Sequence, residues 1–152
     1  MHHYHCRMII GIDSIDKLSE IVDVVHSLIG EGYSVVLLDG ELGAGKTTLV
    51  QLLCKSYGVE QQVSSPTFSI IQEYISPIKG PIIHMDLYRL DKPQELEQIG
   101  FAEYLDSGQL CIIEWPEVGN DYFVMSYIRV DIGVENNNIR NFKITTHDAV
   151  DA

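Results

Sequence analysis

One stretch of the sequence decides the fold: SVVLLDGELGAGKTTLVQLL, from Ser34 to Leu53. It opens with the run SVVLLD, which is typical of a strand buried on both faces, as in parallel sheets. A glycine-rich turn follows, and Leu49, Leu52 and Leu53 then recur at helical spacing as far as about Tyr57. The stretch therefore predicts a strand, a tight turn and a helix in immediate succession.

The turn itself matches the phosphate-binding pattern G-x-x-x-x-G-K-[ST]. Its glycines let the backbone turn so that several N–H groups point at one phosphate, and the helix adds the positive end of its dipole. In this pattern Lys46 reaches the β- and γ-phosphates, and the Thr47 hydroxyl is a ligand of Mg²⁺. We therefore predict a nucleotide site formed by Leu42, Gly43, Ala44, Gly45, Lys46, Thr47 and Thr48.

The P-loop pattern does not identify the base of the nucleotide. Guanine-specific GTPases usually carry an N/T-K-x-D motif after a later strand, and the sequence contains none. ATP is therefore the expected nucleotide, while a plain glycine-rich loop without a ligand is the alternative interpretation.

The charge balance argues against one class of partner. Ten Lys and Arg face 22 Asp and Glu, giving a formal net charge of −12, and the basic residues are scattered along the chain. A protein that grips nucleic acid through its phosphates needs a basic face, so we expect no strong direct binding to RNA or DNA. An acidic surface suits solubility or docking on a basic protein partner.

The length of 152 residues suits one compact domain. No apolar run reaches the length that crosses a bilayer, so no membrane association is expected. The three widely spaced cysteines favour a reducing cytoplasm over a disulfide framework. We expect a flexible N-terminal tail at residues 1–7, whose HHYHC segment is also open to interpretation as a metal site. A single P-loop ATPase domain at 8–147 and a C-terminal tail at 148–152 complete the expected organisation.

The remaining elements follow from the spacing of apolar residues and from turn signals. Asp13 or Ser14 is the expected cap of the first helix. Strand–helix–strand order at the start and hairpins later predict a P-loop NTPase-type, three-layer α/β domain with a mixed central sheet and a C-terminal hairpin. The expected strands cover 8–12, 34–39, 67–74, 81–88, 109–115, 125–134 and 138–146, and the other expected helices cover 15–29, 93–99 and 101–106.

Two buried strands each end in an acid, namely Asp86 in IIHMD and Glu114 in LCIIE. Ligands of a parallel sheet gather outside the carboxyl ends of its strands, so both acids are expected to face the P-loop. Hydrolysis needs a carboxylate on the metal side and a group that orients water. We predict Asp86 in the metal's shell and Glu114 on the metal, directly or through water, or beside the attacking water. A helix cap or a surface salt bridge is the alternative for each.

A third candidate lies between the P-loop helix and the next strand, in the segment SSPTF. In many P-loop proteins a threonine at this place senses the γ-phosphate. Pro66 fixes the local backbone and Thr67 offers a hydroxyl, so Thr67 is the predicted sensor. The alternative is an ordinary turn that enters a strand.

Four blocks in this order and spacing, GELGAGKTT, SPTF, HMDLYRL and IEWPE, resemble the bacterial TsaE family, also called YjeE. The resemblance runs from about Ile10 to Thr145. Members are small ATPases of tRNA threonylcarbamoyladenosine (t6A) synthesis. The resemblance implies a P-loop α/β fold, binding of ATP and Mg²⁺, and slow hydrolysis. It also implies action beside the threonylcarbamoyl transferase TsaD and its companion TsaB, which would explain how an acidic protein serves a tRNA pathway.

The resemblance also suggests roles for individual residues. Lys46 and Thr47 would serve phosphate and Mg²⁺, Thr67 the switch, and Asp86 and Glu114 metal and hydrolysis.

The resemblance also bears on Arg89, Trp115 and the adenine pocket. Arg89 lies in a family block and would form ion pairs within the switch or a structural salt bridge. Trp115 follows Glu114 and would lie by the nucleotide or pack in the core. The adenine pocket is expected around residues 13–17 and Arg140.

Two rival functions use the same phosphate cradle. A small-molecule or nucleoside kinase would need an acceptor site and usually an arginine-rich lid, and the four arginines show no such pairing. A regulatory nucleotide-binding module would lack turnover, against which Asp86 and Glu114 argue.

Overall fold

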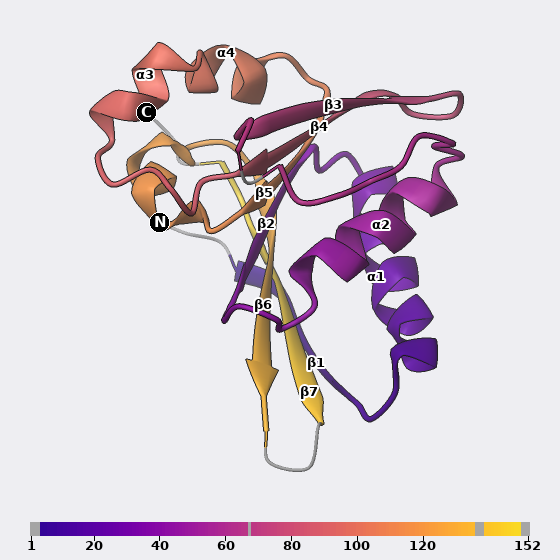
Figure 1. Cartoon of the computed structure of the whole chain (residues 1–152). Coiled ribbons are helices and arrows are strands. Elements are labelled where there is room, and N and C mark those ends of the chain that lie inside the picture. Colours follow the sequence, from indigo (N-terminus) through magenta and orange to yellow (C-terminus); the bar gives the residue numbers. More distant parts are fainter. Residues whose placement is uncertain (1–3, 67, 136–138, 150–152) are drawn as a thin grey trace.

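The computed structural model of the chain describes residues 4–66, 68–135 and 139–149 (Figure 1). Its strands are β1 (Tyr4–Ile12), β2 (Val35–Gly40), β3 (Ile71–Ser76), β4 (Gly80–Asp86), β5 (Leu110–Glu114), β6 (Tyr127–Val134) and β7 (Arg140–His147). Its α-helices are α1 (Leu18–Gly30), α2 (Lys46–Ser56), α3 (Gln94–Gln98) and α4 (Phe101–Asp106), and 3₁₀ helices cover Ile15–Lys17 and Pro116–Tyr122. None of the described helices is long and apolar enough to cross a bilayer.

All of these strands join one sheet in the order β1-β7-β6-β2-β5-β4-β3. The centre is parallel, since β2 pairs with both β5 and β6 and β4 pairs with β5 in the same direction. The outer strands β3, β7 and β1 run antiparallel to their neighbours. The predicted mixed sheet and C-terminal hairpin are therefore confirmed.

Helices cover both faces of the sheet and give the predicted three layers (Figure 1). On one face, α1 and α2 pack on alternate strand residues such as Val36, Leu38 and Ile112. On the other face, α3 and α4 pack on the intervening residues such as Leu37 and Ile113. The central strands are thus buried on both sides, which explains why they read as continuous apolar runs.

The N-terminal strand is longer than the sequence predicts. We expected a flexible tail through residue 7, but β1 begins at Tyr4 and pairs with β7, with Tyr4 opposite His147 and Arg7 opposite Thr145. The antiparallel ladder satisfies backbone groups whatever the side chains are, so the polar composition of the segment hid the strand.

Two further boundaries differ from the expected ones. Neither expected side-chain cap is used at α1: a 3₁₀ turn precedes the helix, and the Asp13 carboxylate pairs with Lys17 at 2.8 Å. β3 begins at Ile71, not at residue 67, because Ile70 adopts a positive φ of 66° and bends the chain. The Asp86 N–H donates to the Ile70 carbonyl at 2.9 Å, which ties this bend to the end of β4.

Candidate nucleotide-binding site

The P-loop connects the end of β2 to the start of α2, as the sequence predicts. Gly43 and Gly45 have φ values of 78° and 111°, which non-glycine residues rarely adopt. Gly40 is needed for a different reason: a Cβ there would lie 2.9 Å from the carbonyl oxygen of Ile132 on β6. The glycines of the motif therefore serve both the turn and the close approach of the loop to the sheet.

Lys46 begins α2 and points back over the loop. Its side chain is buried, its Nζ donates to the carbonyls of Gly40 and Glu41, and it lies 3.9 Å from the centre of the Trp115 ring. Burial lowers the pKa of the Lys46 ammonium, while the nearby carboxylate of Glu114 works in the opposite direction. The ammonium is thus held where the pattern requires a phosphate ligand.

The sheet register brings the two predicted acids together. In the parallel pairing of β4 with β5, Asp86 lies opposite Glu114, and Glu114 lies opposite Leu38 of β2. Both acids are buried, at 5% and 2% exposure. The Thr47 hydroxyl donates to Glu114 Oε1 at 3.2 Å, so the cradle and the acid are in direct contact. The expectation that the strand ends face the P-loop agrees with this arrangement.

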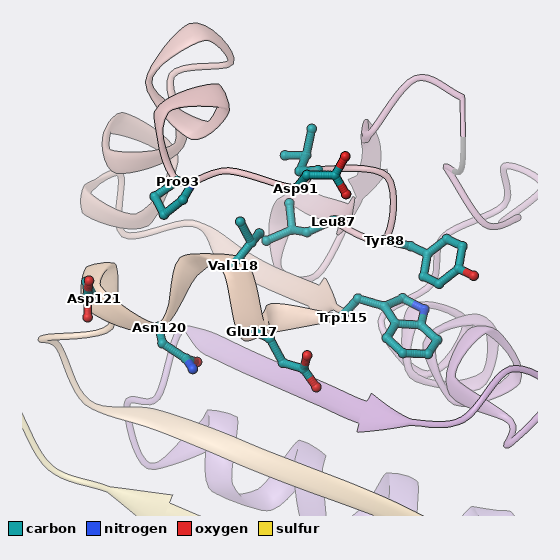
Figure 2. A pocket seen from close by; sticks show the side chains of 10 residues that line it. Leu87, Tyr88, Asp91, Pro93, Trp115, Glu117, Val118, Asn120 and Asp121 are labelled. Atoms are coloured by element: carbon teal, nitrogen blue, oxygen red, sulfur yellow. The ribbon is translucent and has the colours of Figure 1, made fainter.

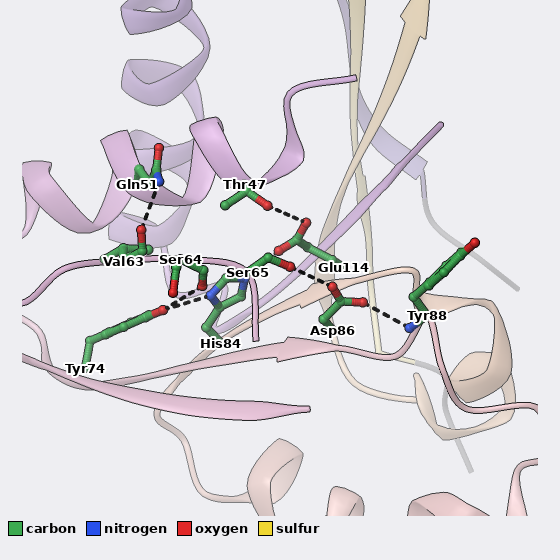
Figure 3. A network of polar contacts seen from close by, with 10 residues as sticks. All are labelled: Thr47, Gln51, Val63, Ser64, Ser65, Tyr74, His84, Asp86, Tyr88 and Glu114. Carbon is green, nitrogen blue, oxygen red and sulfur yellow. Dashed lines mark hydrogen bonds and ion pairs between the residues drawn. The ribbon is translucent and has the colours of Figure 1, made fainter. Parts of the chain in front are cut away.

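The second oxygen of Glu114 takes part in a buried polar chain that crosses to the edge of the sheet (Figure 3). His84 Nε2 lies 2.6 Å from Glu114 Oε2, and the other ring nitrogen, Nδ1, lies 3.2 Å from the Tyr74 hydroxyl. That hydroxyl is also 3.2 Å from the carbonyl oxygen of Ser64. A chain of contacts therefore runs from Thr47 through Glu114 and His84 to the loop before β3.

Asp86 is held from the loop side of the site (Figure 3). The Ser65 hydroxyl donates to Asp86 Oδ2 at 2.9 Å, and the Tyr88 N–H donates to Asp86 Oδ1 at 3.0 Å. The two acids therefore have different partners: Glu114 contacts the cradle, and Asp86 contacts the segments that follow α2 and β4.

A cavity of 310 Å³ lies over the P-loop and gathers the predicted residues. It is lined by Leu42, Gly43, Ala44, Gly45, Lys46, Thr47, Thr48, Ser65, Asp86, Tyr88, Glu114, Trp115 and Arg140. The predicted cradle and both acids thus share one space. Thr67, the predicted γ-phosphate sensor, lies outside the described residues.

Two more cavities adjoin this one. A cavity of 200 Å³ includes Asp13, Ser14, Gly45, Thr48 and Arg140 in its lining, at the place where the adenine pocket is expected. Arg140 also donates to the Gly43 carbonyl at 3.3 Å, so β7 is joined to the P-loop.

The other neighbouring cavity is larger, at 530 Å³. Figure 2 shows Tyr88 and Trp115 at one end of it, and both residues also line the P-loop cavity. Leu87 and Val118 contribute apolar surface to its lining. The two aromatic side chains therefore form a wall shared by two cavities.

Sequence reasoning left two residues open and missed two others. Trp115 lies over Lys46, and Arg89 stacks on the Phe68 ring at 4.2 Å, a contact different from the ion pair considered above. His84 was missed because it lies inside the largely apolar strand β4, and Tyr74 was missed because it lies in the mixed strand β3, IQEYIS, which carries no recognised motif. The available signal was the histidine in PIIHMD, two residues before the acid and hence on the same face of the strand.

The side-chain oxygens that face the cradle suit a magnesium ion. Mg²⁺ prefers hard oxygen ligands, keeps several waters, and usually takes one or two carboxylates together with substrate phosphates. Thr47 and Glu114 offer adjacent oxygens at the P-loop, and Asp86 lies next in the register. Among the described residues, no group of three His, Cys, Asp or Glu forms a metal cluster, so a dedicated all-protein metal cage is absent from that part of the chain.

Comparison with known proteins assigns the family. The family model described as "Threonylcarbamoyl adenosine biosynthesis protein TsaE" matches residues 13–142. A protein of Haemophilus influenzae named tRNA threonylcarbamoyladenosine biosynthesis protein TsaE is 40% identical over 117 residues, covering 76% of this chain and 71% of that protein. The protein of the same name from Rickettsia prowazekii is 40% identical over 107 residues, covering 70% and 73%.

A solved structure supports the fold alone. The crystal structure of Bacillus subtilis YdiB aligns with a TM-score of 0.75 at 23% identity, covering 95% of this chain and 88% of that one. The sequence matches assign the family as well as the fold, since the family model spans most of the chain. The motif residues also line the P-loop cavity. The chain therefore belongs to the TsaE family, which takes part in the biosynthesis of threonylcarbamoyladenosine in tRNA.

Proposed function

We propose that the chain binds ATP with Mg²⁺ and hydrolyses it slowly in the cytoplasm, and that it acts on the transferase TsaD with its companion TsaB, not on tRNA directly. The observation that carries the ATPase proposal is the contact between Thr47 and Glu114. It puts a buried carboxylate against the P-loop hydroxyl, inside the cavity that contains Lys46. Hydrolysis needs a carboxylate on the metal side of the phosphates, and Glu114 is in position to supply it.

In this proposal the residues of the site have different roles. The Lys46 ammonium and the loop N–H groups bind phosphate oxygens, and burial strengthens these electrostatic contacts. Thr47 and Glu114 would hold Mg²⁺, which when bound neutralises phosphate charge. Asp86, fixed by Ser65 and the Tyr88 N–H, would order the loop side of the site and keep a second carboxylate near the metal's waters.

The proposed partner follows from charge and family together. With a net charge of −12, the chain carries the wrong sign for gripping tRNA phosphates. A protein partner that binds tRNA can instead respond to the nucleotide state of this chain. Loops ordered by bound nucleotide and released on hydrolysis are a general means of coupling of this kind. ATP turnover would then reset the transferase complex between cycles.

The first experiment measures ATP hydrolysis by the purified chain, alone and with TsaD and TsaB, without any added phosphoryl acceptor. We expect slow acceptor-independent release of phosphate that the partners change. ADP release that requires an added small-molecule acceptor would indicate the kinase alternative, and no hydrolysis even in single turnover would indicate a regulatory module.

The second experiment asks what the ATP is for. Glu114→Gln keeps the volume of the side chain and removes its charge, so it should reduce hydrolysis by about 10²-fold or more while nucleotide still binds. In a multiple-turnover t6A assay with both partners and unmodified tRNA, this variant should fail to support repeated rounds. Glu97→Gln, at an exposed position on α3, is the matched control and should behave as wild type. Wild-type turnover by a hydrolysis-dead Glu114→Gln protein would remove the reset mechanism.

A further inference from the structure

With the His84 ring neutral, the single hydroxyl proton of Tyr74 has two acceptors within reach in the buried polar network. A carboxylate oxygen only accepts hydrogen bonds, so the contact of His84 with Glu114 Oε2 requires the hydrogen on Nε2. In the neutral ring, Nδ1 is then an acceptor. The Tyr74 hydroxyl lies 3.2 Å from that Nδ1 and 3.2 Å from the Ser64 carbonyl oxygen, which also only accepts. Tyr74 can therefore donate to one of the two at a time.

The middle of this polar network, formed by His84 and Tyr74, is buried. His84 is fully buried and Tyr74 is 1% exposed, so water does not replace a lost partner at low cost. Burial raises the pKa of the Tyr74 phenol, so the hydroxyl keeps its proton at neutral pH. The Ser64 end is exposed and belongs to the serine loop, defined here as residues 64–66. The polar network thus runs from a surface loop at one end to the Glu114 carboxylate beside Thr47 at the other.

Competition for one proton makes the two ends dependent on each other. When the Ser64 carbonyl is within hydrogen-bond distance, it competes with His84 Nδ1 for the hydrogen bond from the Tyr74 hydroxyl. When the loop moves away, the hydroxyl turns to His84 Nδ1, which polarises the ring and strengthens the Nε2–H bond to Glu114. A carboxylate more strongly bound by His84 has less negative charge to offer on the Thr47 side.

Resting on the proposed ATPase function, we propose that Tyr74 is a positioning residue that, through His84, couples the position of the serine loop to the carboxylate of Glu114. Tyr74 acts through other groups: its contacts are the ring of His84 and the loop backbone, and it does not line the P-loop cavity. The coupling uses three contacts, one from the loop to β3 and two across adjacent strands, and needs no change in the glycine cradle.

The test is Tyr74→Phe, which keeps the ring and removes only the hydroxyl. Its matched control is Tyr127→Phe, the same change at a half-buried tyrosine on β6 that stacks on His147. Two measurements do not depend on hydrolysis. Hydrogen exchange of the peptide covering residues 60–66 should become about threefold faster or more in Tyr74→Phe, because the loop loses its anchor. The ¹⁵N shift of His84 Nδ1 should move toward that of a nitrogen without a donor.

Kinetics then test the link to Glu114. Tyr74→Phe should lower kcat by about fivefold or more and leave KM for ATP within about twofold, since the cradle is untouched. Combined with Glu114→Gln, it should lower the residual rate no further, because both changes act through one group. Tyr127→Phe should alter none of these quantities.

The outcomes separate the two proposals. If wild-type protein hydrolyses no ATP, the proposed function fails, and loop exchange with the His84 shift still decides whether the coupling exists. If Tyr74→Phe leaves both of those at wild-type values, the coupling is wrong whatever the hydrolysis rate. A kcat loss of the same factor in the Glu114→Gln background, or a matching loss of ATP affinity, would also overturn it, since either result would assign Tyr74 a general structural role.

Discussion

Replacing Lys46 with alanine tests the phosphate cradle directly. Only 5% of the Lys46 side chain is exposed, and its ammonium already contacts the Gly40 and Glu41 carbonyls and the face of Trp115. A hydrogen bond that involves a charged group contributes about 1.5–3 kcal/mol. Two such bonds to the β- and γ-phosphates therefore contribute about 3–6 kcal/mol. Because each 1.4 kcal/mol is tenfold, the affinity for ATP should fall by about 150-fold or more.

The free protein should change much less. The substitution removes two carbonyl contacts and the stacking on Trp115, but it also removes the cost of burying an ammonium, whose effect is seen in the lowered pKa of Lys46. These effects oppose each other, so we expect the Tm to stay within about 4 °C of wild type. Binding and folding are thereby separable in one variant.

Isothermal titration with ATP and Mg²⁺ measures the affinity, and a thermal melt followed by circular dichroism measures the fold. Lys55→Ala is the matched control, because Lys55 lies in the last turn of the same helix and is exposed. Lys46→Met keeps most of the apolar stem and separates loss of charge from loss of packing on Trp115. A folded Lys46→Ala protein that binds ATP within about threefold of wild type would refute the assignment, since the expected loss of charged contacts is far larger.

Three further predictions follow from individual residues. Gly40→Ala should lower the free energy of unfolding by about 1–3 kcal/mol, because its Cβ would lie 2.9 Å from a backbone carbonyl of β6. Gly133→Ala is the control, since its Cβ would have no neighbour within 4 Å, and equal stability of the two variants in urea would contradict the prediction. Trp115 emission should change on adding Mg²⁺–ATP and stay flat in the variant without the P-loop lysine, because the ring lies over that ammonium. Burial raises the pKa of the Cys54 and Cys111 thiols from 9.0 to about 12, so the unfolded chain ionises first as pH rises. Stability should therefore be intact well below pH 9 and fall through pH 9–12, by about 1.4 kcal/mol per thiol at pH 10, and Cys111→Ala should flatten that fall in urea titrations.

The part of the site that sequence reasoning predicted is local or follows a general rule of sheets. The P-loop is a strand, a turn and a helix that are consecutive in the chain, so its geometry needs no knowledge of distant pairing. Asp86 and Glu114 were found because ligands gather at the carboxyl ends of parallel strands. The register that puts them opposite each other follows from β4 and β5 being neighbours, which the sequence does not state.

The rest depended on pairings between segments far apart in the sequence. β1 begins at Tyr4 only because β7, more than 130 residues later, offers it a ladder. Tyr74 contacts His84 only because β3 folds back on β4 with Tyr74 opposite Ile82, which puts the two polar side chains diagonally on one face. The histidine two residues before Asp86 was a local signal, but nothing in the pattern of β3 indicates that Tyr74 would be its partner.

Under the proposed function, the arrangement of the two acids would give a small domain a means of linking bound nucleotide to an outer loop. Glu114 and Asp86 lie opposite each other on adjacent strands, which in a sheet are about 4.8 Å apart. Glu114 is bound by Thr47 of the helix that begins at the cradle, and Asp86 is bound by Ser65 of the serine loop. A movement of the loop would therefore alter the contact of Ser65 with Asp86, which lies one strand away from Glu114.

No long path through the protein is required for that coupling. The same loop has a second link, which runs through Tyr74 and His84 to Glu114, so the loop contacts each acid by a separate route. A change at the cradle that altered either acid would therefore act on a contact that leads to this loop. A partner that recognises one of those positions would thereby distinguish the nucleotide states of this chain without touching the nucleotide.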